Sequence, residues 1–459
     1  MTSARRTVSE IVGWLAREIY AGVFPPDSRL PAERRLAAQL GVHRSTVALA
    51  YDELAARGLV DRRQGSGTYV HGDLWGLTPD WTRYLGSGGF RPSEALVQRV
   101  REARRQPFVI DLTQADLGPD FWPALTMAAD ALGPLDWGYG HPFGLLRLRT
   151  AIAERFTDAY GRPWDPDAVL VTHGAQQALY LVARALLRPG DAVAMEQPSF
   201  YYSLTLFQSI GVRLIPVPMD DAGIVPDALD AAIRQHRPAM VWLNPTFHNP
   251  TTTTLPEARR REVLAICRRW NLPVVEDDAY GALSLDRNPP LPLKVLDDTQ
   301  RVIYVGTLSK MGAPGLRVGW VLAPRPILER LADVRSQLDG GPDALTQGAA
   351  AALLETTAWS RQRARVREGL YARRAWLQSV AGELAGRGLR VTVPSGGLFA
   401  WIRWAAARPD RVRLEAAIAQ GVVYVPGRVY GAPDGFGRIN YVTPAPEALR
   451  RGLGILAEL

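Results

Sequence analysis

Cysteine and long apolar runs are scarce in this chain of 459 residues, and each shortage excludes a class of protein. Cys267 is the single cysteine, so no disulfide can form within the chain, and we expect it in the core. No run approaches the ~20 apolar residues of a membrane span, and no apolar stretch of signal-peptide length follows Met-Thr-Ser-Ala-Arg-Arg. With 47% hydrophobic residues, we expect a cytoplasmic globular protein with no membrane association and no metal site.

Lysine is also scarce. Lys294 and Lys310 are the only two, although Lys and Arg together number 54. Arginine stays protonated, whereas a lysine amine can lose its proton and attack a carbonyl. Lys310 follows the apolar run Val302 to Val305, which predicts a buried strand that opens into a polar loop. We interpret Lys310 as a candidate nucleophile and expect Lys294, after Pro289-Pro-Leu-Pro, on the surface; random survival of two lysines is the alternative.

The segments around Lys310 match the needs of pyridoxal 5'-phosphate (PLP). This cofactor requires a lysine, a carboxylate for its ring nitrogen, a donor for its ring oxygen, a phosphate site and a flat group against its ring. Asp277, at the end of a strand-like run, is the candidate carboxylate, and Tyr280 and Asn249 are candidate donors. Phe200 is the candidate ring cover. A capping role for Asp277 and a core role for Phe200 remain open.

A phosphate site is predicted where Val169-Leu-Val-Thr-His-Gly-Ala-Gln176 leads into a helix over residues 177–187. Backbone N–H groups at a helix start attract anions, and an arginine can add a bidentate contact. The candidate phosphate-binding residues are Gly174, Ala175, Gln176, Thr307, Ser309 and Arg317.

In this order, the segments resemble the fold-type I aminotransferases of class I/II, roughly from Val109 to Leu459. The most specific segment is Gly306-Thr-Leu-Ser-Lys-Met-Gly-Ala-Pro-Gly-Leu-Arg-Val-Gly319. The resemblance implies an α/β body with a mainly parallel sheet and a smaller C-terminal α+β subdomain. It also implies that Lys310, Asp277 and Tyr280 are the catalytic residues, that Tyr139 reaches the phosphate of a neighbouring subunit, and that Arg438 holds a substrate carboxylate.

The first seventy residues have a different pattern. Ile11, Leu15 and Ile19 have helical spacing, and a helix is predicted between Pro31 and Gly41. A further helix from Arg44 to Leu54 follows a short turn, and residues 59–70 predict two strands about a glycine turn. This order is typical of a winged helix-turn-helix.

This segment resembles the GntR family of DNA-binding domains through Arg29-Leu-Pro-Ala-Glu-Arg-Arg-Leu-Ala, Gly41-Val-His-Arg-Ser-Thr-Val and Gly65-Ser-Gly-Thr-Tyr-Val. The resemblance implies that Arg34 holds a DNA phosphate, that Arg44 and Thr46 face the major groove, and that Gly65 approaches the minor groove. The remaining candidate DNA-binding residues are His43 and Ser45. A small helical dimerisation domain is the alternative for this region.

The whole chain resembles the MocR (GabR-type) subfamily of transcription regulators. We expect a DNA-binding domain over residues 1–70, a linker over 71–108, in which 97–105 could be helical, and a PLP-binding domain over 109–459. The resemblance implies a head-to-tail homodimer on double-stranded operator DNA, with an amino compound or PLP as the signal. A working aminotransferase with a DNA-binding head and a PLP sensor without an amino-acid effector are the alternatives.

The chemistry of the effector rests on one short segment. Tyr201-Tyr-Ser-Leu-Thr-Leu-Phe207, after Phe200, contains no cation that could bind a second acidic group. From this segment we expect an α-amino acid with a neutral or aromatic side chain, if an amino acid is sensed.

Overall fold

The computed structural model describes residues 7–72, 94–123, 132, 138–286, 289–406 and 408–459. The chain divides into two compact units, Met1–Gly88 and Gly89–Leu459, which we describe separately. Helix α5 (Ala95–Ala103) belongs to the second unit. The sequence interpretation expected a helix here but assigned it to the linker, because its basic, glycine-flanked sequence gives no sign of what it packs against.

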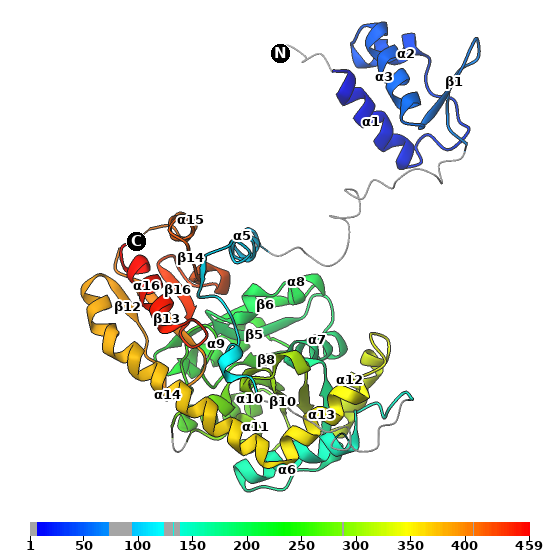
Figure 1. The fold of residues 1–459 in the computed structure, drawn as a ribbon. Coiled ribbons are helices and arrows are strands. Elements are labelled where there is room, and N and C mark those ends of the chain that lie inside the picture. Colours follow the sequence, from blue (N-terminus) through cyan, green and yellow to red (C-terminus); the bar gives the residue numbers. More distant parts are fainter. Residues whose placement is uncertain (1–6, 73–93, 124–131, 133–137, 287–288, 407) are drawn as a thin grey trace. The chain divides into compact units, whose positions relative to one another are not determined.

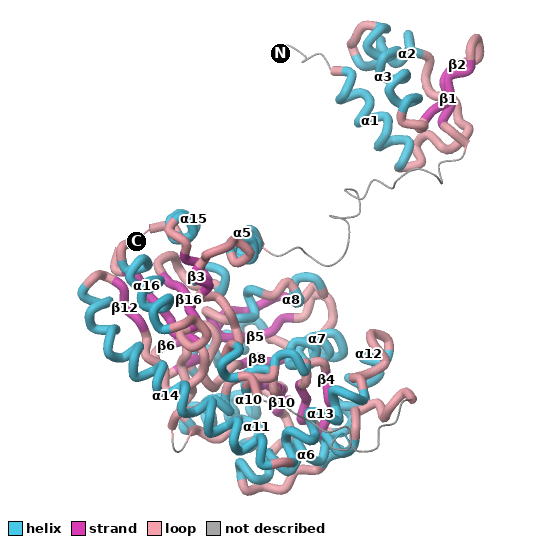
Figure 2. Tube along the Cα trace, viewed as in Figure 1, coloured by secondary structure: helices cyan, strands magenta, loops and turns pink. Residues whose placement is uncertain are grey.

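The first unit is a winged helix-turn-helix, as predicted. Its elements are α1 (Val8–Tyr20), α2 (Glu33–Leu40), α3 (Arg44–Ala56), β1 (Val60–Arg63) and β2 (Gly67–Val70), and Figure 2 shows the helices followed by the hairpin. Thr7 caps α1, and Gly41 ends α2 at a φ of 67°, a left-handed conformation that favours glycine. The expected apolar face is buried in the core of the unit and comprises Ile11, Leu15, Ile19, Val47, Tyr51 and Leu54.

The second unit contains an eight-stranded sheet in the order β4-β11-β10-β9-β8-β5-β6-β7. Strands β10, β9, β8, β5 and β6 are parallel to one another, and β11 and β7 run antiparallel to their neighbours. The predicted mainly parallel sheet is therefore confirmed. The strand bounds are β4 (Val169–Thr172), β5 (Ala192–Gln197), β6 (Arg213–Asp220), β7 (Gly223–Ile224), β8 (Met240–Leu243), β9 (Val274–Asp277), β10 (Val302–Thr307) and β11 (Gly319–Leu322).

Helices cover both faces of this sheet (Figure 1). On one face, α7 (Gly174–Leu186) and α12 (Arg325–Ser336) pack against side chains such as Val193 and Met195. On the other face, α9 (Pro226–His236) and α10 (Glu257–Arg269) pack against Ala194 and Val241. Strands buried on both faces have continuous apolar sequences, which is why the short runs were recognisable. The remaining helices here are α6 (Leu146–Tyr160), α8 (Leu206–Ser209), α11 (Leu293–Leu296) and α13 (Ala344–Glu355).

The C-terminal subdomain is α+β, as expected. The long helix α14 (Thr357–Gly386) leads into an antiparallel sheet in the order β12-β13-β16-β15. A short strand near the start of the unit, β3 (Ile110–Asp111), pairs in parallel with β14 (Val422–Val423). This pairing brings residues 113–116 beside the C-terminal subdomain. The other bounds are β12 (Leu389–Val391), β13 (Phe399–Trp404), β15 (Val425–Pro426), β16 (Phe436–Asn440), α15 (Asp410–Ala419) and α16 (Pro446–Ala457).

Two expectations about single residues have different outcomes. Cys267 lies on α10 and is buried in the core, as predicted. Lys294 was expected on the surface, and this prediction is wrong: its side chain is 8% exposed, and its Nζ donates to the Val302 carbonyl at 2.8 Å. The proline-rich segment before Lys294 gave no sign that its side chain would be buried. None of the helices in the described ranges is both long enough and apolar enough to cross a membrane.

Candidate cofactor cavity and DNA-binding surface

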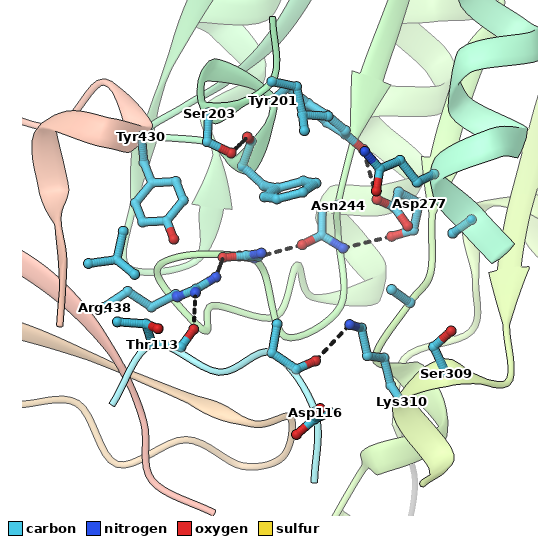
Figure 3. Close-up of a pocket in the computed structure, with 18 of the residues that line it drawn as sticks. Thr113, Asp116, Tyr201, Ser203, Asn244, Asp277, Ser309, Lys310, Tyr430 and Arg438 are labelled. Carbon is cyan, nitrogen blue, oxygen red and sulfur yellow. Dashed lines mark hydrogen bonds between the residues drawn. The ribbon is translucent and has the colours of Figure 1, made fainter. Parts of the chain in front are cut away.

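A cavity of about 570 Å³ opens where the parallel strands of the large sheet end. Asp277 is the last residue of β9, Asn244 directly follows β8, and Lys310 follows β10 after two residues. The carboxyl ends of parallel strands share one edge of a sheet, so these side chains come from separate segments to one place. Figure 3 shows Lys310 and Arg438 approaching the cavity from different sides.

Lys310 lies in a short 3₁₀ helix, Ser309–Met311, at the edge of the cavity. Its Nζ donates to the Ala115 carbonyl at 2.7 Å and lies 5.9 Å from the centre of the Tyr280 ring. Burial, reinforced by the nearby Arg438 guanidinium, lowers the pKa of Lys310 to about 8. The neutral, nucleophilic amine is therefore more abundant near neutral pH than in an ordinary lysine.

The Asp277 carboxyl is buried beside the same cavity. Its Oδ2 accepts a hydrogen bond from the Tyr201 hydroxyl at 3.3 Å, while its Oδ1 has no hydrogen-bond partner. Burial raises the pKa of Asp277 to about 7, and the Tyr201 hydrogen bond opposes that rise. A buried carboxylate oxygen without a partner is costly, so a cationic donor entering the cavity would be bound strongly.

Two asparagines connect the backbone of Asp277 to the opposite wall of the cavity (Figure 3). The Asn244 Nδ2 donates to the Asp277 carbonyl at 2.7 Å, and the Asn244 Oδ1 accepts from the Asn249 N–H at 2.6 Å. The Asn249 Nδ2 donates to the Tyr280 hydroxyl at 3.3 Å. The two predicted ring-oxygen donors, Asn249 and Tyr280, are therefore adjacent and hydrogen-bonded to each other.

Arg438 closes the far side of this network. Its Nη1 donates to the Asn249 Oδ1 and its Nη2 to the Thr113 carbonyl, both at 3.0 Å. The guanidinium carbon lies 4.0 Å from the centre of the Phe399 ring, and the buried Nε has no partner. A guanidinium held over an aromatic ring with an unused N–H is suited to binding a carboxylate.

The predicted phosphate-binding residues meet at the first turn of α7. Gly174 has a φ of 75°, and a Cβ there would lie 2.8 Å from the Arg317 Nη2, so glycine lets the guanidinium approach the start of the helix. The first N–H groups of an α-helix lack partners within the helix. The members of the predicted set that line the cavity are Ala175, Gln176, Thr307, Ser309 and Arg317, whereas Gly174 does not line it. This set combines N–H, hydroxyl and guanidinium donors, as an anion requires.

Phe200 and Tyr139 have different positions. Phe200 lines the cavity, and its backbone N–H donates to the Asn249 carbonyl at 2.9 Å. Tyr139 is 97% exposed and is not among the lining residues. A single chain therefore does not bring Tyr139 to its own cofactor cavity.

Sequence reasoning did not assign several lining residues to the cavity. Asn244 and Tyr201 stood within quoted segments without a role. The position of Asn244 directly after β8 was an available signal, whereas Tyr201 lies in the short 3₁₀ helix Phe200–Ser203. Thr113, Ala115 and Asp116 follow β3 and had no signal, because their place depends on the pairing of β3 with β14. Arg101 and Arg104 of α5 also line the cavity, although the sequence interpretation placed them in the linker.

In the first unit, a hollow of about 610 Å³ lies between the start of α2, the start of α3 and the hairpin. Three predicted DNA-binding residues, Arg34, Arg44 and Gly65, line it. Glu33, which sequence reasoning missed, accepts from the Arg44 Nε at 3.0 Å and also pairs with Arg62 of the hairpin. The other arginines at this hollow are Arg29, Arg62 and Arg63. Clustered arginines at a helix-turn-helix are suited to DNA phosphates.

His43 has a structural role at the start of α3. It is the N-cap residue, and its Nδ1 accepts a hydrogen bond from the Ser45 N–H at 3.3 Å. A capped start fixes the direction in which the helix presents its first residues. Ser45 is exposed and Thr46 is half-buried.

Two family models match the chain. Residues 7–70 match "Bacterial regulatory proteins, gntR family", and residues 123–455 match "Aminotransferase class I and II". The two matches correspond to the two units of the structure.

Two regulators are similar to nearly the whole chain, and a solved aminotransferase is similar to most of it. The HTH-type transcriptional regulator YdfD of Bacillus subtilis (strain 168) is 33% identical over 97% of this chain and 94% of its own length. The HTH-type transcriptional regulator YisV of the same organism is 33% identical over 98% of this chain and 95% of its own. The kynurenine aminotransferase of Pyrococcus horikoshii, solved with PMP, has a TM-score of 0.76 and 27% identity, covering 84% of this chain and 98% of that one.

Proposed function

The chain belongs to the family of GntR-type regulators whose second domain is a class I and II aminotransferase, which is the organisation of the MocR subfamily. From this family membership we propose which molecule the protein senses. We propose that PLP binds covalently to Lys310, and that an amino compound, or PLP itself, changes how the protein binds double-stranded operator DNA. The bacterial cytoplasm, where operator DNA lies, is the proposed location.

The residues of the cavity fit PLP group by group. Lys310 provides the amine, Asp277 Oδ1 the acceptor for the ring N–H, Asn249 and Tyr280 the groups for the ring oxygen, and Phe200 an aromatic neighbour. The start of α7 and Arg317 provide the anion site. When bound, PLP supplies an electron-withdrawing ring that stabilises negative charge on a carbon of the substrate.

One observation carries this proposal. Two buried polar atoms beside the same cavity, Asp277 Oδ1 and Arg438 Nε, lack hydrogen-bond partners, and they have opposite charge character. Lys310 lines the cavity with them. A ligand with a cationic ring nitrogen and a carboxylate satisfies both atoms, as PLP together with an α-amino acid does.

The protein's own residues then have distinct tasks. Arg438 holds and orients the substrate carboxylate, and Lys310, with its pKa near 8, is suited to moving a proton at the substrate α-carbon. Asp277 keeps the ring nitrogen protonated. Asn244 holds Asn249 and the end of β9 together, so the groups on both sides of the ring stay in register.

The test of this proposal measures how ligands of the second unit change the DNA affinity of the full chain. We would select a binding sequence from random duplex DNA with the full chain, and then measure its affinity with PLP-loaded and PLP-free protein and with added amino acids. We expect at least one of these additions to change the affinity for the selected sequence. A protein that selects no sequence, or whose affinity is the same under all conditions, would contradict the proposal.

The DNA-binding surface has its own paired test. Arg34→Ala is expected to weaken binding to all sequences and to reduce the salt dependence, because a phosphate contact is lost. Arg44→Ala is expected to cost about 1–3 kcal/mol on the selected sequence and little elsewhere, because a base contact is lost. If both variants weaken all sequences equally, the assignment of Arg44 to base recognition fails.

We also propose a head-to-tail homodimer in which Tyr139 completes the phosphate site of the neighbouring subunit. The exposure of Tyr139 and its absence from the residues that line its own chain's cavity support this role. Tyr139→Phe is expected to weaken PLP binding in a dimer of normal mass, measured by equilibrium dialysis and sedimentation. A monomeric wild-type protein would contradict the dimer.

A working aminotransferase is the second candidate, because Lys310, Asp277 and Arg438 together meet the needs of that chemistry. The names of the similar regulators favour the first candidate. Steady-state conversion of an amino acid with a keto acid separates them. Sustained turnover by the purified chain without any effect of amino acids on DNA binding would favour the enzyme.

A further inference from the structure

Tyr430 brings a hydroxyl without an assigned role to the Lys310 cavity. It is the last residue of the short 3₁₀ helix Gly427–Tyr430, and it lines the cavity although the residue is only 2% exposed. Its hydroxyl makes no hydrogen bond to any residue in the described part of the chain. A buried hydroxyl that the protein leaves without a partner is available to a ligand.

The fold holds Tyr430 in place on the cavity wall. Its backbone carbonyl accepts a hydrogen bond from the Ser199 N–H at 2.9 Å. The centre of its ring lies 6.5 Å from that of Trp401, and the two rings meet edge to face. The protein therefore presents the hydroxyl at a fixed place before any ligand binds.

Tyr430 and Arg438 lie beside one another at the cavity. Figure 3 shows the hydroxyl end of the Tyr430 ring directed toward the Arg438 guanidinium, and the guanidinium carbon lies 5.3 Å from the centre of the ring. The Arg438 Nη1 and Nη2 donate to Asn249 and Thr113, and the Nε has no partner. Two polar groups with unused donors thus meet on one side of the cavity.

The protonation state of Tyr430 suits it to an anion. Burial raises the pKa of Tyr430, and the nearby Arg438 guanidinium opposes that rise. The hydroxyl therefore stays protonated at neutral pH and can donate. A carboxylate has two oxygens with about four acceptor sites, so a contact with one guanidinium leaves acceptor capacity unused.

Two other hydroxyls near Arg438 and Tyr430 are already engaged by the protein (Figure 3). The Thr113 Oγ1 donates to the Asp111 carboxylate, and the Ser203 Oγ donates to the Phe200 carbonyl, both at 2.6 Å. Either hydroxyl would lose a protein partner on turning to a ligand. The Tyr430 hydroxyl has no such partner to lose among the described residues.

We propose that Tyr430 is a second binding residue for the carboxylate that Arg438 holds, so that the cavity selects compounds with a carboxylate over the corresponding neutral amides. This inference rests on the proposed function, which assigns the substrate carboxylate to Arg438. It leaves the expected neutral or aromatic side chain as it stands, because Tyr430 acts on the carboxylate that all α-amino acids share.

Binding of unreactive ligands to the PLP-loaded full chain tests the role of Tyr430 without turnover. Pentanoate and pentanamide have nearly the same shape and differ in charge, and calorimetry gives both Kd values. We expect the wild-type protein to prefer pentanoate. Tyr430→Phe is expected to reduce this preference about fivefold, because a hydrogen bond to a charged acceptor is stronger than one to a neutral acceptor.

Tyr424→Phe is the matched control. Tyr424 also lies in the C-terminal subdomain, and its buried hydroxyl likewise has no hydrogen-bond partner in the described part of the chain, but it does not line the cavity. This variant is expected to keep the wild-type preference for pentanoate. Equal affinity for the two ligands in wild type, or an unchanged preference in Tyr430→Phe, would overturn the proposal.

A second background tests whether Tyr430 and Arg438 bind the same carboxylate. In Arg438→Gln protein, Tyr430→Phe is expected to change the pentanoate Kd less than it does in wild type, because the carboxylate is no longer held beside the hydroxyl. An equal change in both backgrounds would assign the hydroxyl to another part of the ligand and reject the proposal.

The visible absorption band of lysine-bound PLP separates this inference from the proposed function. A normal band in wild type and in Tyr430→Phe, with an unchanged preference for pentanoate, rejects the role of Tyr430 and leaves the cofactor assignment standing. A band lost only in Tyr430→Phe would make the residue structural and would also overturn the proposal. Absence of the band in wild-type protein incubated with PLP rejects the proposed function itself.

Discussion

Lys310 and Lys294 lie at opposite ends of one strand. Lys310 follows Thr307, the last residue of β10, after two residues, and the Lys294 Nζ donates to the carbonyl of Val302, the first residue of β10. Burial lowers the pKa of each to about 8. A lowered pKa therefore does not distinguish the proposed cofactor-binding lysine from the other buried lysine.

The neighbouring polar groups make the distinction. Near Lys294, the Asp297 carboxylate accepts from the N–H groups of Thr299 and Val302, and the Glu276 carboxylate accepts from the N–H groups of Leu293 and Lys294. The acidic groups around Lys294 are thus engaged by the protein. Beside the Lys310 cavity, Asp277 and Arg438 each retain an atom without a partner. An unpaired carboxylate oxygen and an unpaired guanidinium nitrogen therefore distinguish the surroundings of Lys310 from the carboxylates near Lys294.

The largest expected effect is at Lys310. Lys310→Ala is expected to abolish the visible absorption band of lysine-bound PLP, because Lys310 is the one lysine among the described residues that line the cavity. Borohydride reduction of PLP-loaded wild-type protein, followed by peptide mass spectrometry, is expected to place the adduct on the Lys310 peptide. Lys294→Met is the matched control and should keep the band. A modified Lys294 peptide in the Lys310→Ala protein would remove the distinction between the two lysines.

The next effect concerns the unpaired carboxylate oxygen. Asp277→Asn is expected to weaken PLP binding by about 1.5–3 kcal/mol, because the ring nitrogen loses its charged acceptor. Equilibrium dialysis measures the Kd, and the position of the absorption band reports the protonation of the ring. If the Kd and the band are both unchanged, Asp277 is not the partner of the ring nitrogen.

A smaller effect on PLP affinity is expected at Tyr201, which contacts the Asp277 carboxyl. Tyr201→Phe removes the hydroxyl that donates to the Asp277 Oδ2 at 3.3 Å and keeps the ring that packs against Trp242. The loss of one neutral donor corresponds to about 0.5–1.5 kcal/mol in PLP affinity. We expect the pKa of Asp277 to rise further, so the weakening should be greater near pH 6 than near pH 8. A uniform loss at both pH values would point to packing alone.

The smallest expected effect is at Lys294, and it concerns the free energy of unfolding rather than PLP binding. Between about pH 8 and the ordinary lysine pKa near 10.4, the unfolded chain holds a proton on residue 294 that the folded protein has released. The stability of wild type relative to Lys294→Met should therefore rise with pH across this window, by at most about 1.4 kcal/mol per pH unit. Denaturant unfolding of PLP-free protein measures it. A pH-independent difference would mean that the amine is not held at a lowered pKa.

Much of the cavity could be predicted because its residues follow recognisable strands. The apolar runs before Asp277 and Lys310 indicated buried strands, and parallel strands place their carboxyl ends along one edge. The helix start after Thr172 was recognisable for the same reason. The positions of Asn249 and Tyr280 near one another followed from this edge, whereas their mutual hydrogen bond did not.

The remaining wall depends on contacts between distant segments. Arg438 donates to the carbonyl of Thr113, which lies 325 residues earlier in the chain. That contact depends on the pairing of β3 with β14, and a strand of two residues has no periodicity by which to recognise it. The burial of Lys294 and the packing of α5 against the second unit were missed because they also depend on contacts between distant segments.

The sequence by itself determined the order of the elements, the two-domain organisation and the chemical identity of the lysine, the carboxylate and the arginines. These properties are local, because side-chain periodicity and strand ends can be recognised from residues that are adjacent in the sequence. The tertiary structure decided which lysine faces the cavity at the carboxyl ends of the parallel strands, which polar atoms remain unpaired and which helix contributes to the cavity wall. These properties depend on chain segments that meet only after the sheet has formed, and no local pattern specifies such partners.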